Sequence, residues 1–192
     1  MESFRMTNAI TLRLQEIRVL VCDVDGTLTD GSVTFTATGD EQKTFNVHDG
    51  LGISMAQRHG LDIVFMTGRR SQMVERRATE LGVSIVLQGI SNKRDAIDAL
   101  AKSMNLNMDE IAYVGDDLND IPAMVRAGYV FAVNDACEFV RTNADHVLSK
   151  CGGHGAVREA IELVLDAKVG LATVIEQYIS SAEKLSIKPI VQ

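Results

Sequence analysis

The chain has 192 residues, which suits one domain of ordinary size. It carries 19 Lys and Arg against 26 Asp and Glu, a formal net charge of −7. This balance argues against nucleic acid or a membrane surface as the main partner, because both require clustered positive charge. Hydrophobic residues make up 46% of the chain, enough for a buried core, which excludes a disordered protein.

The cysteine content indicates the compartment. Cys22, Cys137 and Cys151 are few and have no paired spacing, so neither a disulfide framework nor a zinc site is predicted. Charged residues interrupt the apolar runs near the N-terminus, and no window approaches the ~20 apolar residues of a membrane span. We therefore expect a cytoplasmic protein.

Short apolar runs alternate with longer helical patterns along the chain, which is typical of a parallel sheet flanked by helices, an α/β fold. The predicted strands are 19–22, 63–66, 84–87, 111–114, 129–132 and, with the weakest pattern, 146–148. Apolar residues at helical spacing predict helices over about 50–59, 71–81, 93–104, 118–127 and 155–168.

One segment interrupts this alternation. Residues 32–36 and 43–47 read as two strands around a turn, which predicts a β-hairpin over about 31–47, directly after the first strand. Its apolar side chains could pack against its own domain or against a partner, and the sequence leaves both open. We expect one domain over residues 1–170, followed by a helix and a loose tail over 171–192.

Polar side chains gather where the predicted strands end. Asp23 and Asp25 follow the first strand, Thr67 ends the second, and Asp116 and Asp117 follow the fourth. Ligands of open parallel sheets bind at the carboxyl ends of the strands, so these groups are expected to converge. Lys93, at the start of a predicted helix, joins them.

Asp23 and Asp25 form an acid pair that can turn into one pocket. Like charges so close repel, and one would be protonated unless a cation intervenes. With Asp116 and Asp117 nearby, the expected cation is Mg²⁺, which takes oxygen ligands and substrate phosphate. One carboxylate could then attack phosphorus to form an aspartyl-phosphate, while the other transfers the proton. The competing interpretation is an acidic turn with capping side chains.

The remaining signals are weaker when taken singly. Thr67 could present a hydroxyl to a phosphoryl group or simply cap a helix. Lys93 could neutralise a transferring phosphoryl group or be a solvated charge. Asp120 could belong to the metal site or complement a helix dipole.

Taken together and in order, these motifs resemble those of haloacid dehalogenase superfamily phosphatases. The four motifs are residues 23–27 (DVDGT), 67–69 (TGR), 92–93 (NK) and 115–120 (GDDLND). Further segments narrow the resemblance to the 3-deoxy-D-manno-octulosonate 8-phosphate (KDO 8-phosphate) phosphatase family. These segments are 30–31 (DG), 45–50 (FNVHDG), 88–89 (QG), 91–93 (SNK), 112–117 (AYVGDD) and 152–159 (GGHGAVRE).

The resemblance implies a Rossmann-like fold without a large cap domain and Mg²⁺-dependent hydrolysis of a phosphorylated 2-keto-3-deoxy sugar acid, a precursor of lipopolysaccharide. It implies that Asp23 is the nucleophile and Asp25 the acid/base, while Thr67 and Lys93 hold the phosphoryl group. Asp23, Asp116 and the backbone carbonyl of Asp25 would bind Mg²⁺. It also implies a homotetramer in which the hairpin of one subunit helps to close the site of the next.

The resemblance further suggests residues that support the site or bind substrate. They are Asp117, which would act through water, Asp120, Gly68, Arg69, His48, Asp49 and Gly50. Some relatives carry Arg where this chain has His48 and His154, and His is only partly charged near neutral pH. The identity of the substrate therefore stays open.

Three alternatives remain. A nine-carbon acylneuraminate or deaminoneuraminate 9-phosphate has the same keto-acid chemistry, so the motifs do not distinguish it from KDO 8-phosphate. A phospho-receiver signalling module would also gather acids, a Thr and a Lys around Mg²⁺, but would trap phosphate without turnover. A non-catalytic scaffold fits poorly, because no proposed catalytic position is substituted.

Overall fold

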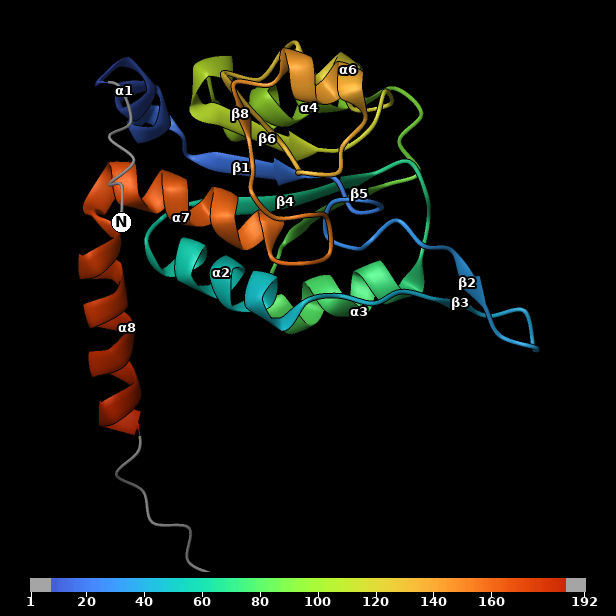
Figure 1. Ribbon diagram of the computed structural model, residues 1–192, viewed down its shortest axis with the longest axis horizontal. Coiled ribbons are helices and arrows are strands. Elements are labelled where there is room, and N and C mark those ends of the chain that lie inside the picture. The colour runs from blue at the N-terminus through green and yellow to red at the C-terminus, as the bar shows by residue number, and fades with distance from the viewer. Residues whose placement is uncertain (1–7, 186–192) are drawn as a thin grey trace, which may run out of the picture.

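A six-stranded parallel sheet forms the centre of the computed structural model, which describes residues 8–185 (Figure 1). The strand order is β5-β4-β1-β6-β7-β8, and every neighbouring pair is parallel. The strands are β1 (Val19–Cys22), β4 (Asp62–Thr67), β5 (Ile85–Gln88), β6 (Ile111–Gly115), β7 (Tyr129–Ala132) and β8 (His146–Val147). All six predicted strands are confirmed, with ends shifted by one residue at most.

Helices cover both faces of the sheet, which gives three layers (Figure 1). One face carries α2 (Val47–Arg58), α3 (Gln72–Leu81) and α7 (Ala156–Val169). The other carries α4 (Lys93–Met104), with α5 (Ile121–Met124) packed against it, and α6 (Glu138–Asn143). Helices α1 (Asn8–Glu16) and α8 (Leu171–Leu185) both pack against α7, and a short 3₁₀ turn, η1 (Met108–Glu110), precedes β6.

Strand β1 lies in the middle of the core. Its four residues are fully buried, as expected for a continuous apolar run covered by helices on both faces. Cys22 pairs with Phe65 of β4 and with Val114 of β6, so the three strands end together. The chain continues to β4 on one side of β1 and later to β6 on the other, which makes this end of the sheet a topological switch point.

The hairpin is present, but its first strand is shorter than predicted and its second strand lies before the predicted range 43–47. Only β2 (Thr34–Phe35) and β3 (Glu41–Gln42) pair, and Val47 already belongs to α2. The predicted five-residue strands are wrong because the side chain of Phe35 is 63% exposed, so no buried face extends the pairing. Phe45 packs against the core of its own domain, whereas the paired part of the hairpin projects beyond the carboxyl edge of the sheet (Figure 1).

Other predictions are corrected or completed by the structure. The helix predicted over 118–127 shrinks to α5, while α1 and α6 were not predicted. The expected helix beyond Gly170 is α8, and the last seven residues of the predicted tail lie outside the described residues. The three cysteines are free. Within residues 8–185, no helix is long and apolar enough to cross a membrane, and the hairpin is the only insertion between β1 and α2, so no large cap domain is present there.

Candidate active site

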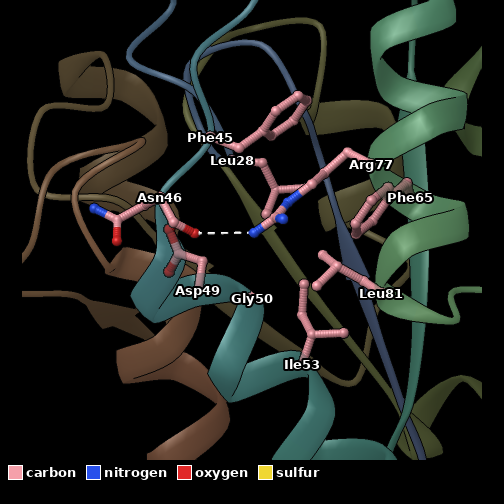
Figure 2. Close-up of a pocket in the computed structure, with 9 residues that line it drawn as sticks. All are labelled: Leu28, Phe45, Asn46, Asp49, Gly50, Ile53, Phe65, Arg77 and Leu81. Atoms are coloured by element: carbon pink, nitrogen blue, oxygen red, sulfur yellow. Dashed lines mark hydrogen bonds between the residues drawn. The ribbon is translucent and has the colours of Figure 1, made fainter. Parts of the chain in front are cut away.

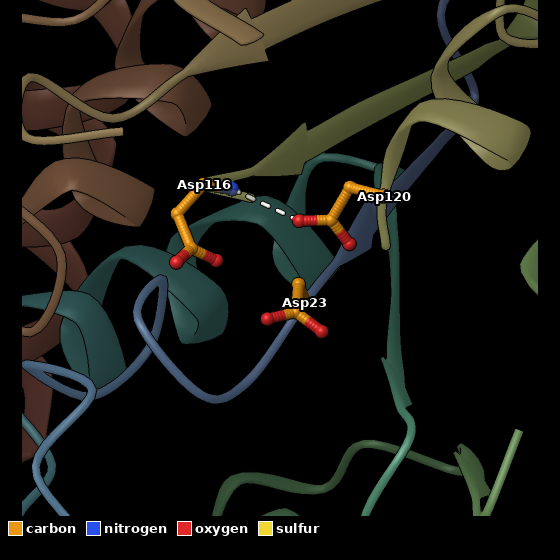
Figure 3. Close-up of side chains that lie close together, drawn as sticks. All are labelled: Asp23, Asp116 and Asp120. Carbon is orange, nitrogen blue, oxygen red and sulfur yellow. Dashed lines mark hydrogen bonds between the residues drawn. The ribbon is translucent and has the colours of Figure 1, made fainter. Parts of the chain in front are cut away.

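Three acids meet at the carboxyl ends of β1 and β6 (Figure 3). Asp23 directly follows β1, Asp116 directly follows β6, and Asp120 immediately precedes α5. One carboxylate oxygen from each lies within 4.8 Å of the others. Asp23 and Asp120 are 2% and 0% exposed, so water screens their repulsion poorly. The structure therefore brings together the acids that the sequence placed at separate strand ends.

Lys93 is the buried counter-charge of this cluster. It is the first residue of α4, whose N-cap Asn92 accepts backbone N–H bonds from the first turn. Its ammonium contacts Asp23 Oδ1 and lies 2.5 Å from Asp120 Oδ1. Burial by itself lowers the pKa of Lys93, but the attraction of Asp23 and Asp120 outweighs it and raises the pKa. Lys93 is therefore a fixed positive charge.

Asp120 organises its neighbours with both carboxylate oxygens. Oδ1 accepts hydrogen bonds from Lys93 and from the Tyr113 hydroxyl, at 2.5 and 2.7 Å. Oδ2 accepts the backbone N–H groups of Asp116 and Asp117, at 2.9 and 3.2 Å. With all these partners, Asp120 is better suited to positioning than to binding a cation. Tyr113 was missed in the sequence because it reads as one more buried strand residue.

Asp116 gives the clearest sign that the site fits a cation. Its burial, followed by the repulsion of Asp120 and Asp117, raises its pKa to about 7. Burial likewise raises the pKa of Asp23. The repulsion of Asp120 raises it further, although the attraction of Lys93 lowers it. A divalent cation between Asp23 and Asp116 would offset these costs, and carboxylate oxygens are ligands that Mg²⁺ prefers. The donor set present therefore fits Mg²⁺.

A glycine leaves room beside this proposed metal position. Gly26 has φ +95°, and a Cβ atom there would overlap the carboxylate of Asp116. Gly39, at the tip of the hairpin, has a similar φ of +89°, but a Cβ atom there would have nothing within 4 Å. Replacing each glycine with alanine therefore separates the effect of steric overlap from that of backbone strain.

We expect Gly26→Ala to lower kcat/KM by at least about 100-fold, because displacing a catalytic group by about 1 Å can have an effect of that size. It should also weaken the rise in Tm that Mg²⁺ produces. Gly39→Ala carries the same kind of backbone strain and should leave both quantities near wild type. Equal losses in the two variants would show that strain, rather than access to Asp116, is responsible.

Asp25 faces a different set of partners from the acid cluster. Thr67 donates its hydroxyl hydrogen to Asp25 Oδ2 at 3.1 Å, so two predicted site residues are in contact. The side chain of Asp25 is 24% exposed, and its carboxylate is not one of the three clustered around Asp116. This separation suits a proton-transfer group that faces substrate rather than the cation.

Two residues of the returning hairpin strand, Glu41 and Lys43 (here called the hairpin stem), also belong to the site. No motif or spacing in the sequence pointed to either. Lys43, just after β3, contacts Asp25 Oδ1 with its ammonium group. Glu41 lies 3.5 Å from the Lys43 ammonium and 2.5 Å from the guanidinium of Arg69. The stem of the hairpin therefore contacts the site of its own chain. Arg69 thus reaches the hairpin from the end of β4, while Gly68 is exposed beside it.

Asp49 and Gly50 have contacts away from the acid cluster, on the side where α2 packs against α3 and α7 (Figure 2). Asp49 is 2% exposed and accepts the backbone N–H of Arg158 at 2.8 Å, at the start of α7. A Cβ atom at Gly50 would overlap the guanidinium of Arg77 from α3. These contacts give both residues a packing role, and the substrate or support role inferred from the motif stays a prediction.

His48 and His154 line a separate surface hollow of about 780 Å³, together with Lys150, Arg158 and Glu162. The hollow lies between the start of α2 and the start of α7, and both histidines are exposed. No residue of the acid cluster lines it. The structure thus brings the two histidines together, but in a place distinct from Asp23 and Asp116.

The fold and the acid cluster fit a protein that handles phosphate groups with a divalent cation, and comparisons with known proteins identify it as a phosphatase. Residues 86–161 match the family model of haloacid dehalogenase-like hydrolases. The KDO 8-phosphate phosphatase of Haemophilus influenzae is 39% identical over 156 residues, which cover 81% of this chain and 87% of that protein. The Escherichia coli K12 enzyme is 40% identical over 159 residues, 83% of this chain and 85% of that protein.

Solved structures agree with the sequence relatives. The KDO 8-phosphate phosphatase of Moraxella catarrhalis, in complex with magnesium, phosphate and KDO, matches with a TM-score of 0.87 and 39% identity. The match covers 90% of this chain and 99% of that one. A cobalt-bound form of the H. influenzae phosphatase matches with a TM-score of 0.81 and 37% identity, covering 85% and 99%.

This chain belongs to the KDO 8-phosphate phosphatase family of the haloacid dehalogenase superfamily, and it is a phosphoric monoester hydrolase. The family resemblance inferred from the motifs is confirmed. Membership of a phosphatase family favours continuous turnover over the stable phosphorylation of a signalling receiver.

Proposed function

We propose that this protein hydrolyses KDO 8-phosphate to KDO and phosphate in a Mg²⁺-dependent reaction. The observation that carries the proposal is the approach of the buried Asp23 and the half-buried Asp116, with Lys93 as counter-charge, at the switch point of the sheet. Relatives about 40% identical over most of the chain act on this phosphate ester, which supports the same substrate here.

Asp23 is the nucleophile of the proposed reaction. One of its carboxylate oxygens attacks phosphorus, the phosphorus–oxygen bond to the sugar breaks, and an aspartyl-phosphate forms. Asp25 gives a proton to the leaving sugar oxygen and then accepts one from the water that hydrolyses the aspartyl-phosphate. Thr67 and Lys93 hold the phosphoryl oxygens, and the fixed charge of Lys93 stabilises negative charge in the transition state.

The metal ligands in this proposal are Asp23, Asp116 and the backbone carbonyl of Asp25, with Asp117 acting through water. When bound, Mg²⁺ would neutralise phosphoryl charge and orient the ester for in-line attack. The chain's own part is to hold the carboxylates of Asp23 and Asp116 close together. Asp120 helps by accepting hydrogen bonds from the backbone N–H groups of Asp116 and Asp117.

The wider setting of the enzyme is also a proposal. We place it in the cytoplasm, in lipopolysaccharide precursor synthesis, with residues 1–170 as the catalytic domain and the remainder as a C-terminal extension. We propose a homotetramer whose hairpins help to close neighbouring sites. The support within this chain is the exposure of Val33 and Phe35, 48% and 63%, on a hairpin that does not bury them.

A nine-carbon keto acid 9-phosphate is the second candidate substrate. His48 and His154 favour keeping it, because they stand together in one surface hollow that could recognise a carboxylate. A weaker positive charge there would alter recognition of a carboxylate without altering the chemistry at phosphorus.

A panel of phosphate esters tests the substrate. We expect kcat/KM to be highest for KDO 8-phosphate, with nine-carbon keto-acid phosphates next and hexose phosphates at least about tenfold lower, a difference of about 1.4 kcal/mol in transition-state binding. EDTA should abolish turnover and added Mg²⁺ should restore it. A simple hexose phosphate at the head of the ranking would contradict the substrate, and full activity in EDTA would contradict the metal.

A further inference from the structure

Lys43 is buried although its surroundings on the hairpin are exposed. Its side chain is 2% exposed, whereas its neighbours Gln42 and Thr44 are exposed. Removing an ammonium group from water is costly unless it is paired. The partners of Lys43 are Asp25, which it contacts directly, and Glu41, at 3.5 Å. The site therefore holds a second buried cation besides Lys93.

The two oxygens of Asp25 are held by different parts of the fold. Thr67, at the end of β4, donates to Oδ2, while Lys43, after β3, contacts Oδ1. One hydrogen bond leaves a carboxyl group free to rotate, but two partners on opposite oxygens fix its plane. Removing Lys43 would leave only the Thr67 hydroxyl to orient Asp25.

Lys43 is in turn fixed by a short chain of charges. Glu41 Oε1 accepts a hydrogen bond from Arg69 at 2.5 Å, and the same oxygen lies 3.5 Å from the Lys43 ammonium. Arg69 follows β4, so the hairpin stem is tied to the rigid sheet edge that also carries Thr67. The position of Lys43 is therefore set by the sheet rather than by the hairpin alone.

We propose that Lys43 is a positioning residue for the reaction, because it aims the carboxyl group of Asp25 at the oxygen of the leaving alcohol. The inference rests on the proposed function, in which Asp25 is the acid. As the Asp23 oxygen bonds to phosphorus, the bond from phosphorus to the leaving oxygen breaks. Its electron pair stays on that oxygen, which receives the proton from Asp25. Lys43 itself keeps its protons.

Leaving-group dependence distinguishes this role from substrate binding. Phenyl phosphate needs protonation of its leaving oxygen more than 4-nitrophenyl phosphate does, and the two esters have similar shapes. For Lys43→Met, we expect kcat/KM to fall on the order of tenfold further for phenyl phosphate than for the nitro ester, part of the 10²–10⁴-fold that a general acid supplies. The ratio of the two values in one preparation does not depend on the fraction folded.

Two further variants complete the experiment. Lys43→Arg keeps a cation within reach and should restore much of the wild-type ratio. Asp25→Asn should show the largest leaving-group effect, and adding Lys43→Met to it should change the ratio no further, because Lys43 acts through Asp25. On KDO 8-phosphate, Lys43→Met should lower kcat with KM nearly unchanged.

The outcomes separate the two proposals. Equal losses on both aryl esters, no loss on either, or a further loss in the Asp25→Asn background would overturn the role of Lys43. A failure of the proposed function would instead appear in variants that leave Lys43 intact. In that case Asp25→Asn would show no leaving-group effect, or Asp23→Asn would remain active.

Discussion

Asp23→Asn is expected to lower kcat by at least about 10⁴-fold, to the background of the assay, because removing a catalytic nucleophile has effects of this size. An amide cannot attack phosphorus to form the acyl phosphate, and it also weakens the proposed metal site. The measurement is steady-state turnover of KDO 8-phosphate at saturating Mg²⁺, together with trapping of phosphorylated enzyme in the wild type.

The fold should survive this change. Asn has nearly the same volume as Asp, and Lys93 keeps Asp120 as a buried partner. A matched control is Asp117→Asn, which removes one acid from the exposed rim of the same site and should cost far less activity. Full activity in Asp23→Asn, with unchanged secondary structure, would reject the covalent mechanism.

Lys93→Met should destabilise the metal-free protein by about 3–5 kcal/mol, because removing one partner of a buried ion pair leaves uncompensated charge in the core. Asp23 and Asp120, 2% and 0% exposed, would lose their shared cation. Turnover should fall by about 10²–10³-fold with the loss of transition-state stabilisation. Denaturant unfolding without and with Mg²⁺ measures the first effect, and Mg²⁺ should stabilise this variant more than the wild type.

Lys102→Met on the same helix is the control. Lys102 is exposed near the end of α4, so its replacement should change the free energy of unfolding by no more than about 0.5 kcal/mol. If the two methionine variants were equally stable, the buried charge network around Lys93 would not contribute as described.

The sheet was predictable from the sequence because its central strands are buried on both faces and appear as continuous apolar runs, such as 19–22. The hairpin strands were over-predicted because two strand-like runs around a turn were interpreted as paired along their whole length, although neither Thr34 nor Phe35 is buried. The helix over 118–127 was over-predicted because Asp120 accepts the backbone N–H groups of Asp116 and Asp117, which holds the preceding residues in a turn. Helices α1 and α6 are short and their patterns were not recognised.

The acids of the site were predictable because strand order brings strand ends together. Asp23, Asp116 and Thr67 each follow or end a recognised strand, so topology alone placed them. Lys43 and Glu41 were not predictable, since their contacts depend on how the hairpin stem returns to the sheet. The packing contacts of Asp49 and Gly50 were not predictable either, because a motif does not show which helices its residues contact.

The turn that carries Asp25 and Gly26 is closed by a segment far along the chain. The backbone N–H of Gly153 donates to the carbonyl oxygen of Thr27 at 2.9 Å, and a Cβ atom at Gly152 would overlap the carbonyl of Gly26. Contacts between such distant segments form slowly during folding, because a long loop must be closed first. The catalytic turn is therefore completed by a segment more than 120 residues further along the chain, so a chain that ended before Gly152 would lack these contacts.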